Sequence, residues 1–349
     1  MKKWLAVLVL AALLSTMLPT VSLASSSGVV NVFNWEDYIS EETLQMFTRE
    51  TGIQVNYMNF TTNEDMLVQV EATPSSFDVV FPSDYAVERM ATQGLLEKIN
   101  FANIPNASQI MPSLKNPTYD PTGEYSVPYM WGTVGILYNT KMVTEPVDSW
   151  AILWDTKYAN NVFMMDSIRD TMGITLKYLG ESMNTRDPIA LEKAKELLIQ
   201  QKQAGIVKAY QVDETKDKMV AGEAALALMW SGDAQYAIDL NPDLAYVVPK
   251  EGSNIWVDAM VIPKGAKNKE NAETFIDFMC RPDIAQINCE EIWYSSPNVG
   301  AIELMGEEYT ENSVMNPSEE VITSCEYFND IQDFIEIYNA LWLEIKSAK

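Results

Sequence analysis

The chain of 349 residues is 47% hydrophobic and 21% charged, which is typical of a soluble globular protein and is long enough for two domains. Its 49 acidic and 24 basic residues give a formal net charge of −25, which argues against nucleic acid or an anionic membrane surface as a partner; such acidity fits cationic ligands but also serves solubility alone. The chain contains no histidine, so nucleophilic sites built on a Ser-His or Cys-His pair and metal sites with histidine ligands are excluded.

The N-terminus has the pattern of a secretory signal. Lys2 and Lys3 precede the apolar run WLAVLVLAALL, which is too short to span a bilayer comfortably, and Ser22 and Ala24 offer small residues for cleavage. We therefore interpret residues 1–24 as a signal peptide, with an uncleaved anchor as the alternative. No cysteine lies near the cut, so a lipid anchor is not indicated, and the mature protein is expected to be periplasmic or secreted.

The first third of the mature chain alternates short apolar runs with helical periods. Ser40 and Gly52 bound the first helix, and Asp84 has the position of an N-cap for the third. An alternation of this kind implies a parallel sheet covered by helices. The expected strands are 29–35, 53–60 and 77–83, and the expected helices are 41–51, 63–73 and 85–93.

A long β run at 125–139 is expected to cross into a second lobe, and residues 244–263 are expected to lead the chain back. We therefore predict an α/β protein of two lobes, each a mixed sheet flanked by helices, with a ligand cleft between the lobes and a hinge that closes on the ligand. Lobe 1 is predicted as residues 25–133 plus 257–301, and lobe 2 as residues 134–256 plus 302–349. The other expected strands are 162–166 and 226–230, and the other expected helices are 170–179, 187–204, 215–221, 268–280, 282–292 and 328–347.

The chain has three cysteines, Cys280, Cys289 and Cys325. An odd number leaves at least one of them unpaired within the monomer. Cys280 and Cys289 flank Pro282, and the sequence leaves open whether these two form a disulfide.

Aromatic and acidic residues recur at the predicted strand ends and crossovers. The first group is Trp35-Glu36-Asp37-Tyr38, at the end of the first strand. Any single group has an ordinary interpretation, since a tryptophan there usually belongs to the core and an aspartate usually caps a helix. Their recurrence at ends of strands remote in sequence is harder to explain in that way. The other groups are Ser83-Asp84-Tyr85, residues 166–170, Trp230-Ser231-Gly232-Asp233, Trp256-Val257-Asp258 and Tyr294.

This combination of side chains suits an aliphatic dication. Aromatic faces attract ammonium groups by about 0.5–2 kcal/mol each and also line an alkyl chain. Carboxylates pair with ammonium groups at fixed points and thereby set the length of the ligand. A sugar suits the set less well, because a sugar site would also draw on Asn, Gln, Arg and Lys, and a quaternary amine needs an aromatic cage more than several carboxylates. No metal or cofactor is expected.

Six motifs lie between Phe33 and Asn298, within a match to one known family that runs in register from about Val29 to the C-terminus: FNWEDYI, FPSDYAV, YSVPYMWG, WSGD, WVDAMVIPKGAKNKENA and WYSSPN. In these motifs the chain resembles bacterial spermidine/putrescine-binding proteins, which are the extracytoplasmic receptors of polyamine ABC importers. The resemblance implies the two-lobed type II periplasmic-binding-protein fold and a polyamine ligand. It also implies a monomer that works with ABC-transporter permease subunits and meets the membrane only through the permease.

The resemblance also implies roles for individual residues. Asp258, in WVD, matches an acid that pairs with one amine, and Asp170 matches an acid toward the opposite end of the ligand. Ser83 and Tyr85 match hydrogen-bonding groups near Asp258. The aromatic walls are matched by Trp35, Tyr38, Trp230, Trp256 and Tyr294, and polar contacts by Glu36 and Asp37.

The chain departs from the spermidine-preferring pattern at two positions. Where that pattern has an acid three residues before Asp170 this chain has Ser167, and where it has a glutamine near the C-terminus this chain has Phe328. Asp233, in WSGD, instead resembles the acid of putrescine-selective members. Losing a far acid and gaining a nearer one shortens the span between carboxylates, so we expect a preference for putrescine without excluding spermidine.

Three other functions compete with this one. Paired carboxylates such as Asp166/Asp170 or Asp233/Asp258 can hydrolyse glycosides, but the absence of a nucleophile–base cluster disfavours an enzyme. A polyamine-sensing module that docks a membrane signalling receptor remains an alternative that the sequence does not separate from a transport receptor. A receptor of the same fold for another small organic cation is the third.

Overall fold

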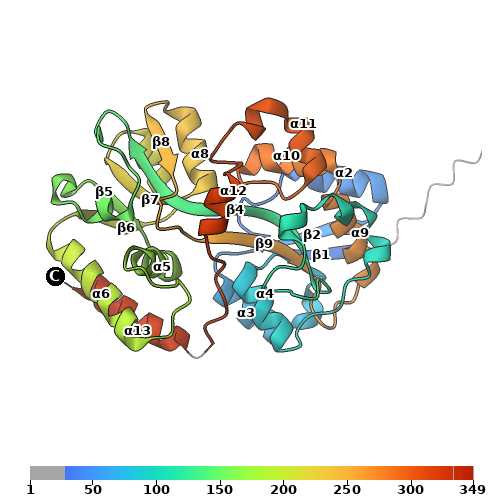
Figure 1. The fold of residues 1–349 in the computed structure, drawn as a ribbon. Helices are drawn as coiled ribbons and strands as arrows, with labels where there is room; N and C mark the ends of the chain where they lie inside the picture. Colours follow the sequence, from blue (N-terminus) through green and yellow to red (C-terminus); the bar gives the residue numbers. More distant parts are fainter. Residues whose placement is uncertain (1–27, 333, 349) are drawn as a thin grey trace, which may run out of the picture.

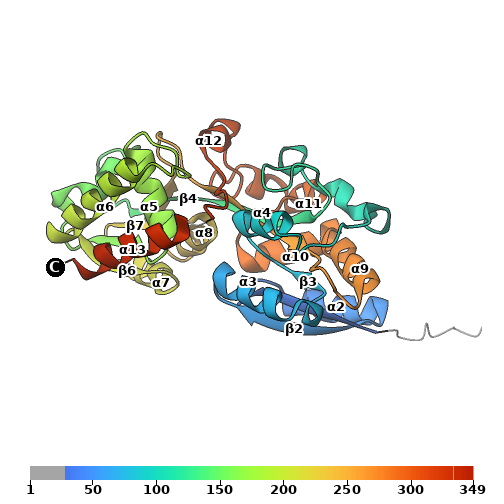
Figure 2. The same cartoon turned by 90° about the horizontal axis from the view of Figure 1, so that it is seen from below.

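The computed structural model describes residues 28–332 and 334–348. The predicted signal peptide, residues 1–24, lies outside the described residues. The described part consists of two lobes joined by long strands (Figures 1 and 2). Within it, no helix is both long enough and apolar enough to cross a membrane.

The sheet of the first lobe is built around β1 (Val29–Trp35). β1 pairs in parallel with β2 (Gln54–Phe60) on one side and with β3 (Val79–Val80) on the other. β9 (Ile255–Val261) pairs antiparallel with β3, so the sheet is mixed, as predicted. β3 is shorter than the predicted run 77–83, because only its two central valines pair with neighbouring strands.

β4 (Ser126–Asn139) crosses from the first lobe to the second (Figure 1). Its first half pairs antiparallel with β9, and its second half with β7 (Leu226–Trp230) and β8 (Leu244–Val247). β5 (Val162–Met165) and β6 (Val207–Gln211) complete the strand order β2-β1-β3-β9-β4-β7-β5-β6. The junction between the lobes therefore rests on β4 and β9, an arrangement that allows hinge closure.

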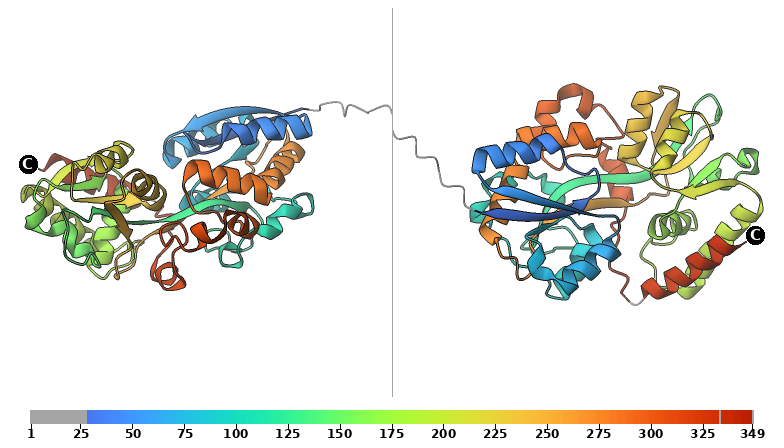
Figure 3. Two further views of the ribbon diagram at one scale, coloured as in Figure 1. Left: turned by 90° about the horizontal axis from the view of Figure 1, so that it is seen from above. Right: turned by 180° about the vertical axis from the view of Figure 1, so that it is seen from behind.

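Helices pack around the strands of each lobe (Figure 3). Helix α2 (Glu41–Thr51) ends at Gly52, whose φ of 74° is left-handed and suits glycine. Ser40 stands at its N-cap as predicted, but the hydroxyl donates to Glu291 Oε2 at 2.9 Å instead of capping the helix. The other helices of the first lobe are α3 (Asn63–Ala72), α4 (Asp84–Thr92), α9 (Lys269–Met279), α10 (Pro282–Ile292), α11 (Val299–Thr310) and α12 (Glu319–Ser324); those of the second are α5 (Ile168–Tyr178), α6 (Pro188–Gln203), α7 (Glu214–Val220), α8 (Ser231–Leu240) and α13 (Phe334–Ser347).

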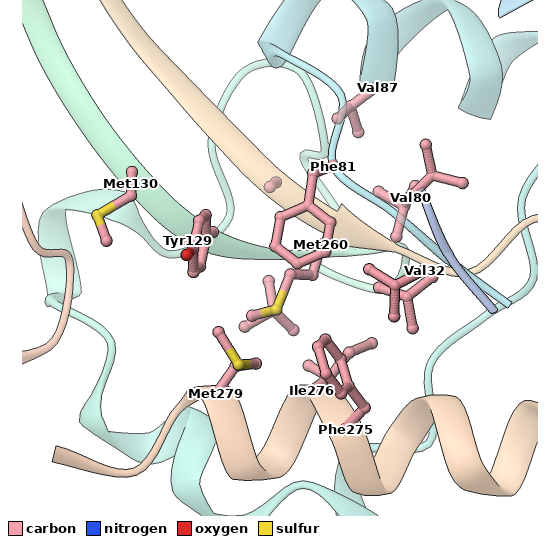
Figure 4. Packing of buried hydrophobic residues seen from close by; sticks show 14 of the residues in the cluster. Val32, Val80, Phe81, Val87, Tyr129, Met130, Met260, Phe275, Ile276 and Met279 are labelled. Carbon is pink, nitrogen blue, oxygen red and sulfur yellow. The ribbon is translucent and has the colours of Figure 1, made fainter. Parts of the chain in front are cut away.

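Each lobe has its own hydrophobic core. In the first, Phe81, Tyr129 and Met260 face Met279 and its neighbours on α9 (Figure 4). This interior isolates the strands from solvent on their α9 side.

The two hydrophobic cores indicate where the C-terminal part of the chain passes from the first lobe to the second. Tyr309 and Met315 belong to the core of the first lobe, whereas Phe328 and Ile331 belong to that of the second. The boundary expected from the sequence assigns residues 302–349 to lobe 2. We therefore propose that lobe 1 continues to about residue 327 before the chain crosses for the third time.

Several elements differ from the prediction. The sequence analysis missed β6, α8, α11 and α12, and it began the last helix at 328 instead of Phe334. β6 is half-buried without clear alternation, and α8 follows β7 directly, with Trp230 ending the strand and Ser231 beginning the helix. α11 is broken at Gly306, where φ is 73°. The predicted N-cap Asp84 is wrong: Ser83 holds the cap position and α4 begins at Asp84.

The structure shows that Cys280 and Cys289 do not form a disulfide. Cys280, Cys289 and Cys325 are all free, and the first two are buried. The Cys289 thiol donates to the carbonyl of Tyr294 at 3.0 Å, so this cysteine helps to fix the loop that carries a predicted site residue.

Candidate ligand-binding site

Asp258 lies near the middle of β9, where the first lobe meets the junction. An isolated β-bridge joins it to Ser83, and the amide of Ala259 donates to the carbonyl of Pro82 at 3.0 Å. The start of α4 is therefore fastened to β9 beside this carboxylate. Asp258 is 7% exposed, so its charge lies largely out of contact with water.

The electrostatics of Asp258 indicate a site for a cation. Burial raises its pKa to about 6, and the nearby hydroxyls of Ser83 and Tyr38 lower it only in part. Neither Oδ1 of Asp258 nor the Tyr38 hydroxyl has a hydrogen-bond partner among the described residues. A buried carboxylate without a full set of donors is costly, and an ammonium group would supply both charge and donors.

Aromatic rings surround this carboxylate. Tyr38 and Tyr294 meet edge to face with centroids 5.9 Å apart, and Tyr294 meets Trp256 in the same way at 4.9 Å. The Tyr129 hydroxyl donates to the carbonyl of Tyr38 at 2.9 Å and holds that residue in place. Trp35 lies nearby in the chain, where its indole nitrogen donates to the carbonyl of Phe81 at 2.9 Å.

Asp170 is the corresponding acid of the second lobe. It is 5% exposed in the first turn of α5, and burial raises its pKa to about 6. The Ser167 hydroxyl donates to its Oδ2 at 2.5 Å, while the neighbouring Arg169 and Trp230 also favour its charged form. The structure thus gathers Ser167, Asp170 and Trp230 in one place.

Asp233 differs from the other two acids because it already forms an ion pair. It lies in the first turn of α8, and Nζ of Lys216 is 3.4 Å from its Oδ1. Burial raises its pKa, whereas Lys216 lowers it. Tyr294 of the first lobe lies close enough to influence Asp233 as well, so this tyrosine stands between Asp258 and Asp233.

Ser83 and Tyr85 are held together by Asn63. Its Nδ2 donates to both hydroxyl oxygens at 3.0 Å, and its Oδ1 accepts from the amide of Ser83 at 3.1 Å. The guanidinium of Arg169, from the second lobe, lies 5.4 Å from the centre of the Tyr85 ring. Tyr85 therefore marks a second contact between the lobes.

Glu36 and Asp37 are not drawn into the buried cluster. Both are exposed on the turn after β1, where Asp37 adopts a φ of 50°. Their proximity to Trp35 and Tyr38 in sequence does not bring them into the interior, because the turn points them outward while the neighbouring aromatic residues pack inward.

The sequence analysis gave no ligand-binding role to Asp84, Tyr119 or Arg169. All three are buried, and each has an unpartnered polar atom among the described residues. Asp84 was available as a signal, since it sits beside Ser83, but its position suggested an N-cap. Tyr119 and Arg169 carried no local signal, because their relation to the site arises only from the tertiary fold.

A surface cavity occurs elsewhere, beside the third crossing, and we do not assign the ligand to it. Two of its three acids already have partners: Glu326 pairs with Lys177 at 2.8 Å, and Glu251 accepts from the Ser149 hydroxyl. Across the described residues, no group of three or more acidic or cysteine side chains could hold a metal ion.

Gly232 is required where the lobes touch. A Cβ at this position would lie 2.3 Å from ring atoms of Tyr294, which is too close for any real contact. We expect Gly232→Ala to displace Tyr294 and to weaken ligand binding about tenfold or more. Adding a methyl group to a closely packed contact typically costs about 1–3 kcal/mol, which is enough to shift the ring from its place. Gly94→Ala is the control: it strains a left-handed residue in open space and should leave the dissociation constant unchanged. Equal affinity for Gly232→Ala and the parent protein would contradict this role.

Asp258→Asn is expected to stabilise the unliganded protein at pH 8 but not at pH 4. The native pKa of about 6 exceeds the usual 3.8, so the native state binds this proton more tightly than the unfolded chain does. Stability therefore falls as pH rises from about 4 to about 6 and stays lower above that range. Asparagine carries no charge, so the variant avoids this loss in the free energy of unfolding, which amounts to about 1–3 kcal/mol. Thermal melts at both pH values test the sign; a variant that melts below the parent protein at pH 8 would refute it.

Comparison with known proteins identifies a family and several relatives of this chain. The family model described as bacterial extracellular solute-binding protein matches residues 42–316. The spermidine/putrescine-binding periplasmic protein of Salmonella typhimurium is 34% identical over 351 residues, covering 100% of both chains. The putrescine-binding periplasmic protein of Pseudomonas aeruginosa is 30% identical and covers 93% of this chain and 94% of the relative.

A solved structure of a substrate-binding protein has a similar fold. The spermidine/putrescine ABC transporter substrate-binding protein of Streptococcus pneumoniae, in complex with calcium and HEPES, superposes with a TM-score of 0.82. It is 37% identical, and the match covers 92% of this chain and 99% of that one.

Proposed function

The chain belongs to the family of bacterial extracellular solute-binding proteins, and from this premise we propose that it is a polyamine receptor that delivers its ligand to an ABC importer. The relatives named above are periplasmic binding proteins for spermidine and putrescine or for putrescine, and the solved structure is that of an ABC transporter substrate-binding protein. We place the receptor outside the cytoplasm, acting as a monomer that docks on the permease.

One observation carries the proposal. Each lobe presents a buried carboxylate with a pKa raised to about 6, Asp258 in the first and Asp170 in the second. Aromatic side chains flank both acids. An aliphatic chain with an ammonium group at each end supplies a positive charge to each of the two acids and covers the rings with its methylene groups.

The same arrangement supports a mechanism of closure. A diamine that pairs with Asp258 and Asp170 together contacts both lobes, so it binds the closed form more tightly than the open form. Bending at β4 and β9 brings the lobes together, and the ligand shifts the equilibrium by its difference in affinity for the two forms. The permease would then recognise the closed, loaded receptor.

We propose that putrescine is preferred over spermidine. Ser167 replaces an acid of the spermidine pattern, and Phe328 stands where that pattern has a glutamine. The Arg169 guanidinium lies 4.3 Å from the centre of the Phe328 ring, and we propose that this fixed cation stands at the end of the site where the spermidine pattern has its glutamine. A third ammonium group would meet repulsion there. The Lys216–Asp233 pair weakens this preference, because the lysine competes with a ligand amine for Asp233.

Isothermal titration calorimetry with putrescine and spermidine tests both the function and the preference. We expect exothermic one-to-one binding of both ligands, with the smaller dissociation constant for putrescine. Spermidine that binds tenfold more tightly than putrescine would overturn the preference, and no binding of either would overturn the proposed function.

A further inference from the structure

Asp84 is the most deeply buried acid beside the site, and nothing so far assigns it a role. It begins α4 and is 1% exposed. Its Oδ1 accepts from the amide of Tyr85 at 2.7 Å, whereas its Oδ2 has no partner among the described residues. One oxygen of a fully buried carboxyl group is therefore available for an interaction that the protein itself does not provide.

The surroundings of Asp84 contain a second acid and a remote cation. Asp258, joined to the neighbouring Ser83 by the β-bridge, repels a negative charge on Asp84, and Arg169 from the second lobe attracts one. Burial is the largest cause that raises the pKa of Asp84 well above its usual range. The remaining titratable groups that face it are the hydroxyls of Tyr85, Tyr119 and Tyr327.

A purely structural role does not account for this carboxyl group. Asp120, another buried acid of the first lobe, shows what a structural aspartate does: its Oδ2 accepts from the amides of Tyr125 and Ser126 at 2.9 and 3.0 Å and from the Ser126 hydroxyl at 2.9 Å. Asp84 makes one bond of this kind, to its immediate neighbour Tyr85, and the nearby backbone of Val257 on β9 also favours its charged form. The Tyr119 hydroxyl close to it is also unpartnered.

We propose that Asp84 is a positioning residue for the amine held by Asp258, and that the Asp84 carboxyl group loses its proton when the charged amine binds. In the empty site Asp84 carries the proton, because two adjacent buried carboxylates cannot both be charged without a cation. When an ammonium group binds, the O–H bond of Asp84 breaks and the proton passes to the solvent buffer. Closure brings Arg169 nearer and favours the same ionised state.

This exchange rests on the proposed function, since it requires an ammonium ligand at Asp258. It predicts that ligand binding releases protons at a pH where the other acids of the site are already charged. Asp258 and Asp170, with pKa values of about 6, are both ionised at pH 8. A proton released at pH 8 therefore reports on Asp84 and not on these two acids.

Calorimetry with putrescine at pH 8, in phosphate and in Tris, measures this proton. The two buffers differ in heat of ionisation, so the difference in binding heat gives the number of protons released. We expect about one proton for each putrescine bound by the parent protein. Asp84→Asn, which preserves the shape and the neutral state, should bind with the same heat in both buffers and with a weaker pH dependence. Asp65→Asn removes an exposed acid of the same lobe and should behave like the parent protein.

Infrared difference spectra keep the proposal testable if Asp84→Asn does not fold. The unliganded parent protein at pH 8 should show the carbonyl stretch of a protonated carboxylic acid, and putrescine should abolish it. Binding of putrescine with equal heat in both buffers and no loss of this band would overturn the role of Asp84 while leaving the proposed function intact. Proton release from Asp84→Asn equal to that of the parent protein would also overturn it. The absence of any binding heat in the parent protein would instead reject the proposed function.

Discussion

Replacing Asp258 with asparagine will weaken putrescine binding by at least about 2 kcal/mol, or roughly 30-fold in the dissociation constant. The carboxylate is 7% exposed, and its Oδ1 has no partner among the described residues. An ammonium group that enters this site loses its water, and only a charge at Asp258 offsets that loss. Asparagine keeps the shape of the side chain but not the charge, so the effect isolates the ion pair.

Asp37→Asn is the matched control for this substitution. It makes the same chemical change on the exposed turn after β1, outside the buried cluster. We expect its dissociation constant to stay within about threefold of the parent value, because exposed ion pairs contribute little. If Asp258→Asn bound putrescine as well as Asp37→Asn does, the assignment of the first-lobe amine site would be wrong.

Replacing Asp170 with asparagine will have a comparable effect on affinity and will also uncouple binding from closure. Asp170 is the buried acid of the second lobe, so its loss leaves a diamine attached at one end only. A ligand held by one lobe has little difference in affinity for the open and closed forms, and therefore shifts their populations little.

Small-angle X-ray scattering separates these two consequences. Saturating putrescine should reduce the radius of gyration of the parent protein but not that of Asp170→Asn. Asp166→Asn serves as control, since Asp166 is an exposed acid four positions earlier whose Oδ2 pairs with Lys346 at 2.7 Å. Full compaction of Asp170→Asn at saturating putrescine would show that Asp170 does not bridge the lobes.

The sequence predicted those parts of the fold that local patterns control. Short apolar runs separated by helical periods predict the strands of the first lobe, the long crossing strand and the return strand. Gly52 marked a helix end because the backbone there is left-handed, a conformation that favours glycine. α8 escaped prediction because it begins directly after β7, without a loop or a polar cap to announce it.

The candidate site was predictable to the extent that its residues lie at strand ends or crossovers, although Trp256 and Asp258 lie within β9. Tyr38, Ser83, Asp258, Trp256 and Tyr294 come from four sequence-remote segments, and the structure gathers them around one carboxylate. The states of individual acids could not be predicted, because they depend on partners from other elements.

Two acids show why local sequence is insufficient. Asp233 has Lys216 beside it, contributed by α7, and this reduces its capacity to bind an amine. Asp84 has the local signature of a helix cap, and only the packing of β9 and Tyr119 around it reveals a buried carboxyl group with one unpartnered oxygen. Burial and tertiary neighbours decide both cases.

A thermal-shift panel of aliphatic amines tests the central claim most directly. A ligand that binds only the folded protein raises its melting temperature by mass action. The panel would comprise putrescine, cadaverine and spermidine, with butylamine as a matched control that carries a single ammonium group. We predict large upward shifts for the diamines and polyamines, the largest for putrescine, and little shift for butylamine at equal concentration. Equal shifts for butylamine and putrescine, or no shift with any polyamine, would contradict a site in which one carboxylate from each lobe holds one end of a dication.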